Sequence, residues 1–187
     1  NDALQTNWLQ TQLNTSAIDP NIDFIFTYNH QPAHSEIWPD GNSSYVNDEL
    51  YPIEASYPKM VMTTHGHSHC YERGTIRTTH SSNWDFRTVI CGGAGGNLDR
   101  WGMYANQTDY PEIQKSVDNY CFMLVDINMN TKTINTTMYS MGNPDKPRNL
   151  EVMDKWHRFL NQTAPDKPFA ISPSGVATAT PILTASA

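Results

Sequence analysis

The sequence has few charged residues and an excess of acidic over basic ones. Only 17% of its 187 residues are charged, and 12 lysines and arginines stand against 19 aspartates and glutamates, for a net charge of −7. Binding to a nucleic-acid backbone relies on basic patches, so this balance argues against a nucleic-acid partner. An anionic ligand would have to be held by something other than lysine and arginine, and bound metal cations can supply that charge.

Long hydrophobic runs are also missing. No stretch approaches the ~18 apolar residues that a transmembrane helix needs, so we expect no membrane span. No signal peptide is visible, but the chain starts inside a helical pattern, and we expect the natural N-terminus to lie further upstream. The chain is rich in Asn, Thr and Ser, which is typical of an extracellular protein.

Cysteine is scarce, and the three cysteines, Cys70, Cys91 and Cys121, are widely spaced. This spacing excludes a zinc ribbon and a thioredoxin motif. Cys91 and Cys121 both lie in apolar, strand-like runs, so they are either small buried hydrophobic residues or partners in a disulfide. The sequence leaves their pairing open.

Helix-like and strand-like patterns alternate in the first part of the chain. Residues 3–14 carry apolar residues at helical spacing, which predicts an amphipathic helix packed on a core. Those apolar residues are Leu4, Trp8, Leu9 and Leu13. Buried strands are predicted at 22–28 and 60–64, with a helix at about 45–56 between them. This order is typical of an α/β fold, in which ligands gather at the carboxyl ends of strands.

The second part of the chain is richer in strand patterns. Strands are predicted at residues 75–79, 86–91, 119–127 and 133–141, and a last amphipathic helix at about 149–161. Residues 128–132 form the turn of a hairpin, and His157 is expected on the surface of the last helix. The glycine-rich segment 92–97 has no Gly-Lys-Ser/Thr, so we interpret it as a strand end that passes close beneath a site.

Three histidines, His65, His67 and His69, fall within five residues at the end of the strand at 60–64. Neutral imidazole is the commonest metal ligand in proteins. Two such rings one residue apart can face one site only if the backbone turns sharply, and we expect Gly66 to allow that turn. The alternative is a surface loop that is merely rich in histidine, but the position at a strand end favours a metal site.

A second candidate ligand, His30, follows the strand at 22–28 and lies 37 residues before His67. Pro32 and His34 come soon after it. Since both motifs follow strands, the two histidines can meet at one edge of a sheet.

These motifs match a known pattern. Gly66-His67-Ser68-His69, followed by Tyr71-Glu72-Arg73, resembles the last metal-binding motif of the calcineurin-like metallophosphoesterases, and the suffix is most similar to the purple acid phosphatase branch. His30 resembles the strand-end histidine of the same family. The sequence departs from the pattern at Thr27, where purple acid phosphatases usually carry valine.

The resemblance implies a fold and a domain organisation. Residues 1–161 would form the second half of a four-layer α/β/β/α metallophosphoesterase sandwich of the α/β class. Residues 162–187 begin with a proline-containing linker. The rest of that segment is either the start of a following β-sandwich module or a disordered tail, and the sequence leaves both open. The chain would then be part of a longer multidomain protein.

The resemblance also implies roles for the site residues. His30 and His67 would bind one metal ion and His69 another, the ions being divalent or trivalent iron, zinc or manganese. His34 is the candidate for contacting phosphate or protonating the leaving oxygen. Tyr71, Glu72 and Arg73 would orient the metal loop, with Arg73 or Glu72 in an ion pair. His65 either supports the ligands or is structural, and His80 is expected on the surface.

Part of the family's ligand set is absent from this chain. The two-metal site also needs two aspartates, one of them bridging, and an asparagine, and none of Asp2, Asp19 and Asp23 stands in the required context. The missing N-terminal half of the catalytic domain is therefore an expected partner. The expected function is extracellular, metal-dependent hydrolysis of phosphoric esters by hydroxide attack on phosphorus, with phosphate esters as substrates. The alternative is a non-catalytic structural or adhesive module that keeps the fold.

Overall fold

A computed structural model describes residues 2–76, 85–146 and 148–159. Its helices and strands, in chain order, are α1 (Asp2–Ile18), β1 (Ile25–Tyr28), α2 (Tyr51–Glu54), β2 (Met60–His65), β3 (Tyr71–Ile76), β4 (Phe86–Cys91), β5 (Ile113–Val117), β6 (Cys121–Asn128), β7 (Thr133–Ser140) and β8 (Glu151–Phe159). A 3₁₀ turn at Pro39–Gly41 and a π-helical segment at Val46–Leu50 precede α2.

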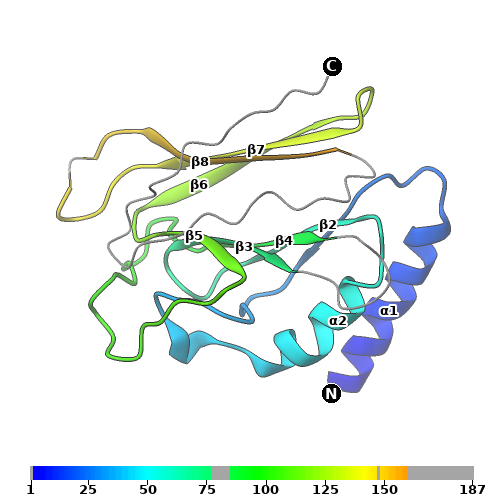
Figure 1. Ribbon diagram of the computed structural model, residues 1–187, viewed down its shortest axis with the longest axis horizontal. Helices are drawn as coiled ribbons and strands as arrows, with labels where there is room; N and C mark the ends of the chain where they lie inside the picture. The colour runs from blue at the N-terminus through cyan, green and yellow to red at the C-terminus, as the bar shows by residue number, and fades with distance from the viewer. Residues whose placement is uncertain (1, 77–84, 147, 160–187) are drawn as a thin grey trace.

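Two sheets stack on one another, and the helices lie on the outer face of the larger sheet (Figure 1). The larger sheet has the order β1-β2-β4-β3-β5, with β1, β2 and β4 parallel and β3 antiparallel to both β4 and β5. The smaller sheet is the antiparallel meander β6-β7-β8. The expected α/β class is thus confirmed. The described residues form three layers, two sheets and a layer of helices, and the four-layer sandwich of which they would be half stays a prediction.

The predicted helix at about 149–161 is wrong, because the segment forms β8, which pairs with β7 along its length. Asp154, Trp156 and Arg158 alternate along the strand, and all three interact with the larger sheet or its neighbouring loop. Two of these three are charged, so the apolar alternation that marks a strand is hidden in the sequence. His157 therefore lies on a strand and not on a helix.

The N-terminal helix is confirmed and is longer than predicted, but only part of its apolar stripe reaches the core. Leu13 is buried and Leu9 packs beside it, whereas Leu4 and Trp8 are 72% and 62% exposed. The strand predicted at 22–28 is shorter and lies at the edge of its sheet. Successive side chains of β1 point to opposite faces of the sheet, and Phe26 and Tyr28 on one of these faces are exposed, so β1 is not the buried strand we predicted.

The other predicted elements agree with the structure within a few residues. The strands at 60–64, 86–91, 119–127 and 133–141 correspond to β2, β4, β6 and β7, and a turn joins the last two as predicted. The predicted helix at 45–56 is split between the π-helical segment and α2. Strand β3 begins earlier than predicted, at Tyr71, and residues 77–79, like the linker and tail at 162–187, lie outside the described residues.

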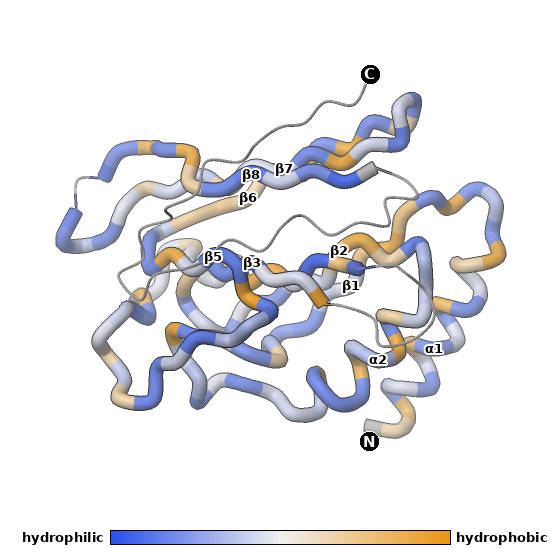
Figure 2. The backbone as a smooth tube through the Cα atoms, viewed as in Figure 1, coloured by the Kyte–Doolittle hydropathy of each residue, from blue (hydrophilic) through white to orange (hydrophobic). Residues whose placement is uncertain are grey.

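Hydrophobic side chains fill both faces of the larger sheet. The core between the sheets contains Tyr71, Val89, Ile134, Met138 and Trp156, and the core beneath the helices contains Leu13, Leu50, Met60 and Phe86. Hydrophobic residues gather in short stretches such as β2, and hydrophilic residues fill most connecting loops (Figure 2). Within the described ranges, no helix has the length and apolar character needed to cross a bilayer.

Candidate metal centre

Two histidines meet at the carboxyl ends of β1 and β2. Because these strands are parallel neighbours, their ends lie at the same edge of the sheet. Backbone hydrogen bonds continue past the strands, from Asn29 N to Thr64 O at 3.2 Å and from Gly66 N to His30 O at 3.1 Å. This pairing brings His30 Nε2 to 3.1 Å from His67 Nδ1, with the rings at an interplanar angle of 74°.

The donor set of these two rings fits a metal ion. Two nitrogens that bind one tetrahedral ion at ~2.0–2.1 Å lie roughly 3.3 Å apart, close to the separation found between His30 and His67. Burial, reinforced by the neighbouring His30 ring, lowers the pKa of His67. A lowered pKa favours the neutral imidazole, which is the form that binds a metal.

The backbone turns sharply at His67 and not at Gly66 as we expected. His67 has φ of 65°, in the left-handed region that few non-glycine residues occupy. Tight bonds from Ser68 N to Gly66 O and from Cys70 N to Ser68 O continue the turn. A backbone conformation of this kind costs ~1–3 kcal/mol and tends to occur at functional sites.

His69 contacts residues of the segment that follows β4. Its Nδ1 contacts the Asn97 carbonyl at 2.6 Å, and its backbone N donates to Asp99 Oδ2 at 2.7 Å. With Nδ1 donating to that carbonyl, Nε2 keeps its lone pair for a ligand. Among the residues that the structure describes, no three His, Cys, Asp or Glu side chains converge on one metal position. The structure therefore brings the rings of His30 and His67 into contact, whereas the His69 ring is held by the Asn97 carbonyl.

The glycine-rich segment supports the histidine loop from below. A Cβ atom on Gly92 would lie 2.0 Å from the Ser68 carbonyl oxygen, and one on Gly96 would lie 3.6 Å from the His69 ring. The interpretation of this segment as a strand end passing close beneath the site is thereby confirmed.

The loop that follows His30 places a tryptophan against the His67 ring, which the sequence did not indicate. The Trp38 ring lies 4.7 Å from the His67 ring, and a Cβ on Gly41 would lie 2.7 Å from Trp38 and 3.0 Å from His67. Gly41 thus lets this loop press the indole against a candidate ligand. Pro39, Asp40 and Gly41 are residue types that favour a turn, but nothing in the sequence indicates which side chain such a turn would place beside His67.

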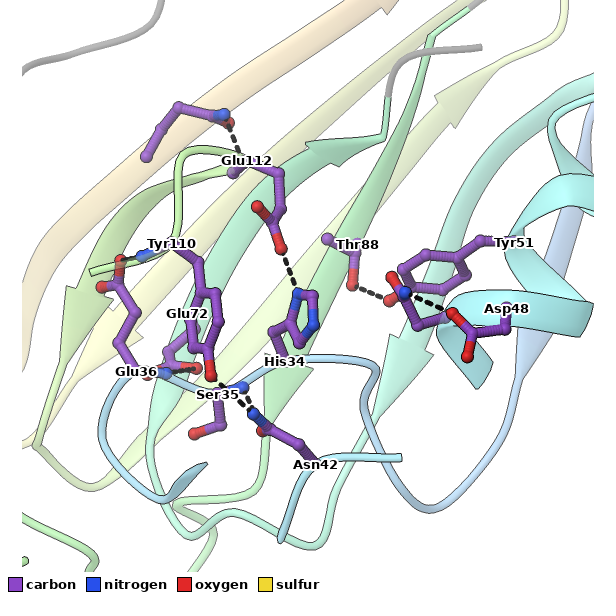
Figure 3. A network of polar contacts seen from close by, with 12 residues as sticks. His34, Ser35, Glu36, Asn42, Asp48, Tyr51, Glu72, Thr88, Tyr110 and Glu112 are labelled. Atoms are coloured by element: carbon purple, nitrogen blue, oxygen red, sulfur yellow. Dashed lines mark hydrogen bonds and ion pairs between the residues drawn. The ribbon is translucent and has the colours of Figure 1, made fainter. Parts of the chain in front are cut away.

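His34, the candidate acid, contacts a different set of residues. Its Nδ1 forms an ion pair with Glu112, and its ring stacks on Tyr110 with centroids 4.3 Å apart. Burial alone would raise the pKa of Glu112, but the bond to His34 helps bring it below its usual value. Figure 3 shows this pair beside the loop that follows His30. The catalytic role of His34 stays a prediction.

His65 and His157 make other contacts than the His30–His67 pair. His65 is buried, and its Nε2 lies 3.2 Å from the hydroxyl of Tyr51 on α2. Burial lowers its pKa to about 4. His157 lies on β8, and His80 lies outside the described residues.

Tyr71, Glu72 and Arg73 follow one another at the start of β3. Their side chains therefore point alternately to opposite faces of the sheet and contact different parts of the protein. Tyr71 and Arg73 both donate to Asp154 on β8, so Arg73 forms the expected ion pair, but the pair ties the two sheets together. Glu72 accepts hydrogen bonds from Glu36 N and Ile37 N and so holds the loop that follows His30.

Two buried carboxyl groups, Glu36 and Glu72, anchor that loop (Figure 3). Glu36 accepts from Tyr110 N at 2.9 Å and from the hydroxyl of Ser116. Burial raises the pKa of Glu36, and it raises the pKa of Glu72 to about 8. Glu72 therefore retains a proton in the folded protein at pH values where the unfolded chain has lost it.

Stability should consequently fall as pH rises between 6.5 and 8. In that range the folded state holds a proton on Glu72 that the unfolded state, with an ordinary carboxyl pKa, does not, so higher pH favours unfolding. Each pH unit in this range lowers the free energy of unfolding by up to 1.36 kcal/mol, so Glu72 contributes a loss of about 1–2 kcal/mol. Urea unfolding at several pH values should show a shallower decline in Glu72→Gln and an unchanged decline in Glu49→Gln, a surface control. An identical slope in Glu72→Gln would contradict the assignment.

Comparison with known proteins gave no matching protein-family model and no matching curated sequence. Among solved structures, the chain is similar to a purple acid phosphatase from yellow lupin (Lupinus luteus) seeds. The TM-score is 0.60 at 14% sequence identity, and the match covers 94% of this chain but 31% of the lupin protein. At this identity the likeness is one of fold alone. The chain spans about a third of that relative.

Proposed function

We propose that this chain carries part of the two-metal centre of a purple-acid-phosphatase-like phosphomonoesterase. The observation that carries the proposal is the 3.1 Å approach of His30 Nε2 to His67 Nδ1 at the ends of adjacent parallel strands. The likeness in fold to the lupin phosphatase supports it. His30 and His67 would share one ion, and His69, oriented by Asn97, would offer Nε2 to a second ion of iron, zinc or manganese.

Bound metal cations would supply the positive charge that hydrolysis of a phosphate ester needs. Two bound cations would neutralise the charge of a phosphate ester and lower the pKa of a water molecule to ~7, so that hydroxide would be available for attack on phosphorus. The chain's own residues hold the ligands: Trp38 and the Gly41 turn fix the His67 ring, and Gly92 supports the loop between His67 and His69. His34 would act on the leaving oxygen, with Glu112 on its Nδ1 fixing the ring orientation.

The remaining ligands would come from polypeptide that packs against the open edges of both sheets. β1 is the edge of the larger sheet and exposes Phe26 and Tyr28. β6 is an edge of the smaller sheet and exposes Leu124 and Ile127. β8 contacts β3 through Asp154, and β6 lies at the other edge of its sheet. The N-terminal half of a metallophosphoesterase domain would cover these edges, and we place the assembled enzyme outside the cytoplasm.

The test uses the complete gene product that contains this sequence. We expect metal ions to co-purify with it and an aryl phosphate to be hydrolysed, with activity lost on chelation and restored by added metal. His67→Ala should lower the rate by about 10²-fold or more, since it removes a proposed ligand. His157→Ala, which alters a histidine on β8, should not change the rate.

A non-catalytic module predicts different results from the same samples. It would hold no stoichiometric metal and would release no phosphate above background. Activity that is unchanged in His67→Ala would also contradict the proposal, because the two facing imidazole rings would then have no part in the reaction.

A further inference from the structure

Two cysteines from different sheets lie against one another. Cys91 ends β4 in the larger sheet, and Cys121 begins β6 in the smaller one. Their sulfur atoms are 3.9 Å apart, which is about the van der Waals contact distance of two thiols. A hydrogen bond from Cys121 N to the carbonyl of Gly93, two residues after the end of β4, joins β6 to the segment that follows β4, at 3.0 Å.

The surroundings keep the two sulfurs facing each other. A Cβ on Gly93 would lie 3.1 Å from Cys121 Sγ, so the glycine leaves just enough room for that thiol. Cys70, the third cysteine, is fully buried in a separate cluster with Ile37 and Ile90. Cys91 is the partly exposed member of the pair, whereas Cys121 is 5% exposed.

We propose that Cys91 and Cys121 form a disulfide that links the two sheets directly beneath the histidine loop. A disulfide requires the sulfurs to close to ~2.0 Å, which rotation of the two side chains from a contact pair can achieve. The proposal rests on the placement of the two cysteines and does not depend on the phosphoesterase assignment. Of the two alternatives that the sequence left open, buried hydrophobic residues or a disulfide, the proposal takes the disulfide.

Exchange with a small-molecule disulfide such as oxidised glutathione would form the bond. The partly exposed Cys91 attacks one glutathione sulfur as a thiolate, and one glutathione thiolate leaves. Cys121 then attacks the Cys91 sulfur, the protein S–S bond forms, and the second glutathione thiolate leaves. The two thiol protons pass to the two released glutathiones, and the two electrons lost by the cysteines reduce the glutathione disulfide. The hydrogen bond from Cys121 lowers the pKa of Cys91 and so supports its role as the attacking thiol.

The bond would stabilise the strand end that supports the site. It closes a loop of 30 residues and lies next to Gly92, which contacts the Ser68 carbonyl. Loops of this length give a sizeable gain in the chain-entropy description, so we expect the melting temperature to rise by about 5–10 °C on oxidation.

The experiment treats the full protein with oxidised glutathione, unfolds it in denaturant and alkylates the free thiols before peptide mass mapping. The expected result is a Cys91–Cys121 cross-linked peptide with only Cys70 alkylated. Adding a reductant should lower the melting temperature of the wild type and leave that of Cys91→Ser unchanged. Cys70→Ala should keep the cross-link.

Three outcomes would overturn the proposal. One is alkylation of all three cysteines after oxidation, and another is a cross-link that includes Cys70. The third is a melting temperature that responds equally to reductant in the wild type and in Cys91→Ser. The mapping is done on the wild type, so the result stands even if a cysteine variant folds poorly.

Discussion

Replacing Gly92 with alanine is expected to destabilise the protein by about 3 kcal/mol or more, at the upper end for overpacked sites. The added Cβ would lie 2.0 Å from the Ser68 carbonyl oxygen and 3.0 Å from its carbonyl carbon. Both are backbone atoms, so no side chain can rotate away to relieve the clash. Ser68 lies between His67 and His69, so any shift that makes room also moves the two candidate ligands.

Gly96→Ala is the matched control for this effect. It lies in the same segment, but its added Cβ would approach nothing closer than the His69 ring at 3.6 Å, an ordinary contact. We expect it to change the free energy of unfolding by less than ~1 kcal/mol. Urea unfolding measures both variants, and zinc titration should show weaker binding in Gly92→Ala alone. Equal stability of the two variants would show that the strand end does not support the histidine loop.

The parts of the site that could be predicted from sequence are those determined by short stretches of neighbouring residues. Strands end where a run of strand-forming residues gives way to polar and turn residues, so the positions of His30 and His67 after β1 and β2 could be predicted directly. Their contact followed from one rule, that parallel neighbours end at the same edge. The glycine-rich segment was interpretable for the same reason, because repeated glycine at a strand end signals a close backbone approach.

The parts that could not be predicted depend on partners distant in sequence. Strand β8 was mistaken for a helix because its inward face carries Asp154 and Arg158, whose burial is tolerable only beside Arg73, Tyr71 and the Asp85 carbonyl. The left-handed conformation of His67 was assigned to Gly66 because local propensity favours glycine there. Tertiary packing decided both cases, and a single sequence carries no record of which distant residue supplies the compensating contact.

Asp154→Ala is expected to cost about 3–5 kcal/mol, the range for breaking a buried ion pair by removing one partner. The Asp154 carboxylate accepts from Arg73 Nε at 2.6 Å, from Arg73 Nη2 at 3.2 Å and from the Tyr71 hydroxyl at 2.8 Å. The side chains of Arg73 and Asp154 are 4% and 9% exposed. Alanine would leave the guanidinium without this carboxylate in a place that water scarcely reaches, and it would detach β8 from β3.

The matched control is Asp145→Ala, which removes the carboxylate of an ion pair with Arg100 whose members are 29% and 67% exposed. Solvent weakens such a pair, so the control should cost no more than ~1 kcal/mol. Denaturant unfolding of both variants, and of a double variant with Arg73→Met and Asp154→Leu, separates charge from packing. If the double variant recovers much of the loss, the cost of Asp154→Ala lies in the stranded charge. If Asp154→Ala is no more harmful than Asp145→Ala, the pair does not hold the two sheets together, and apolar burial between them must be sufficient.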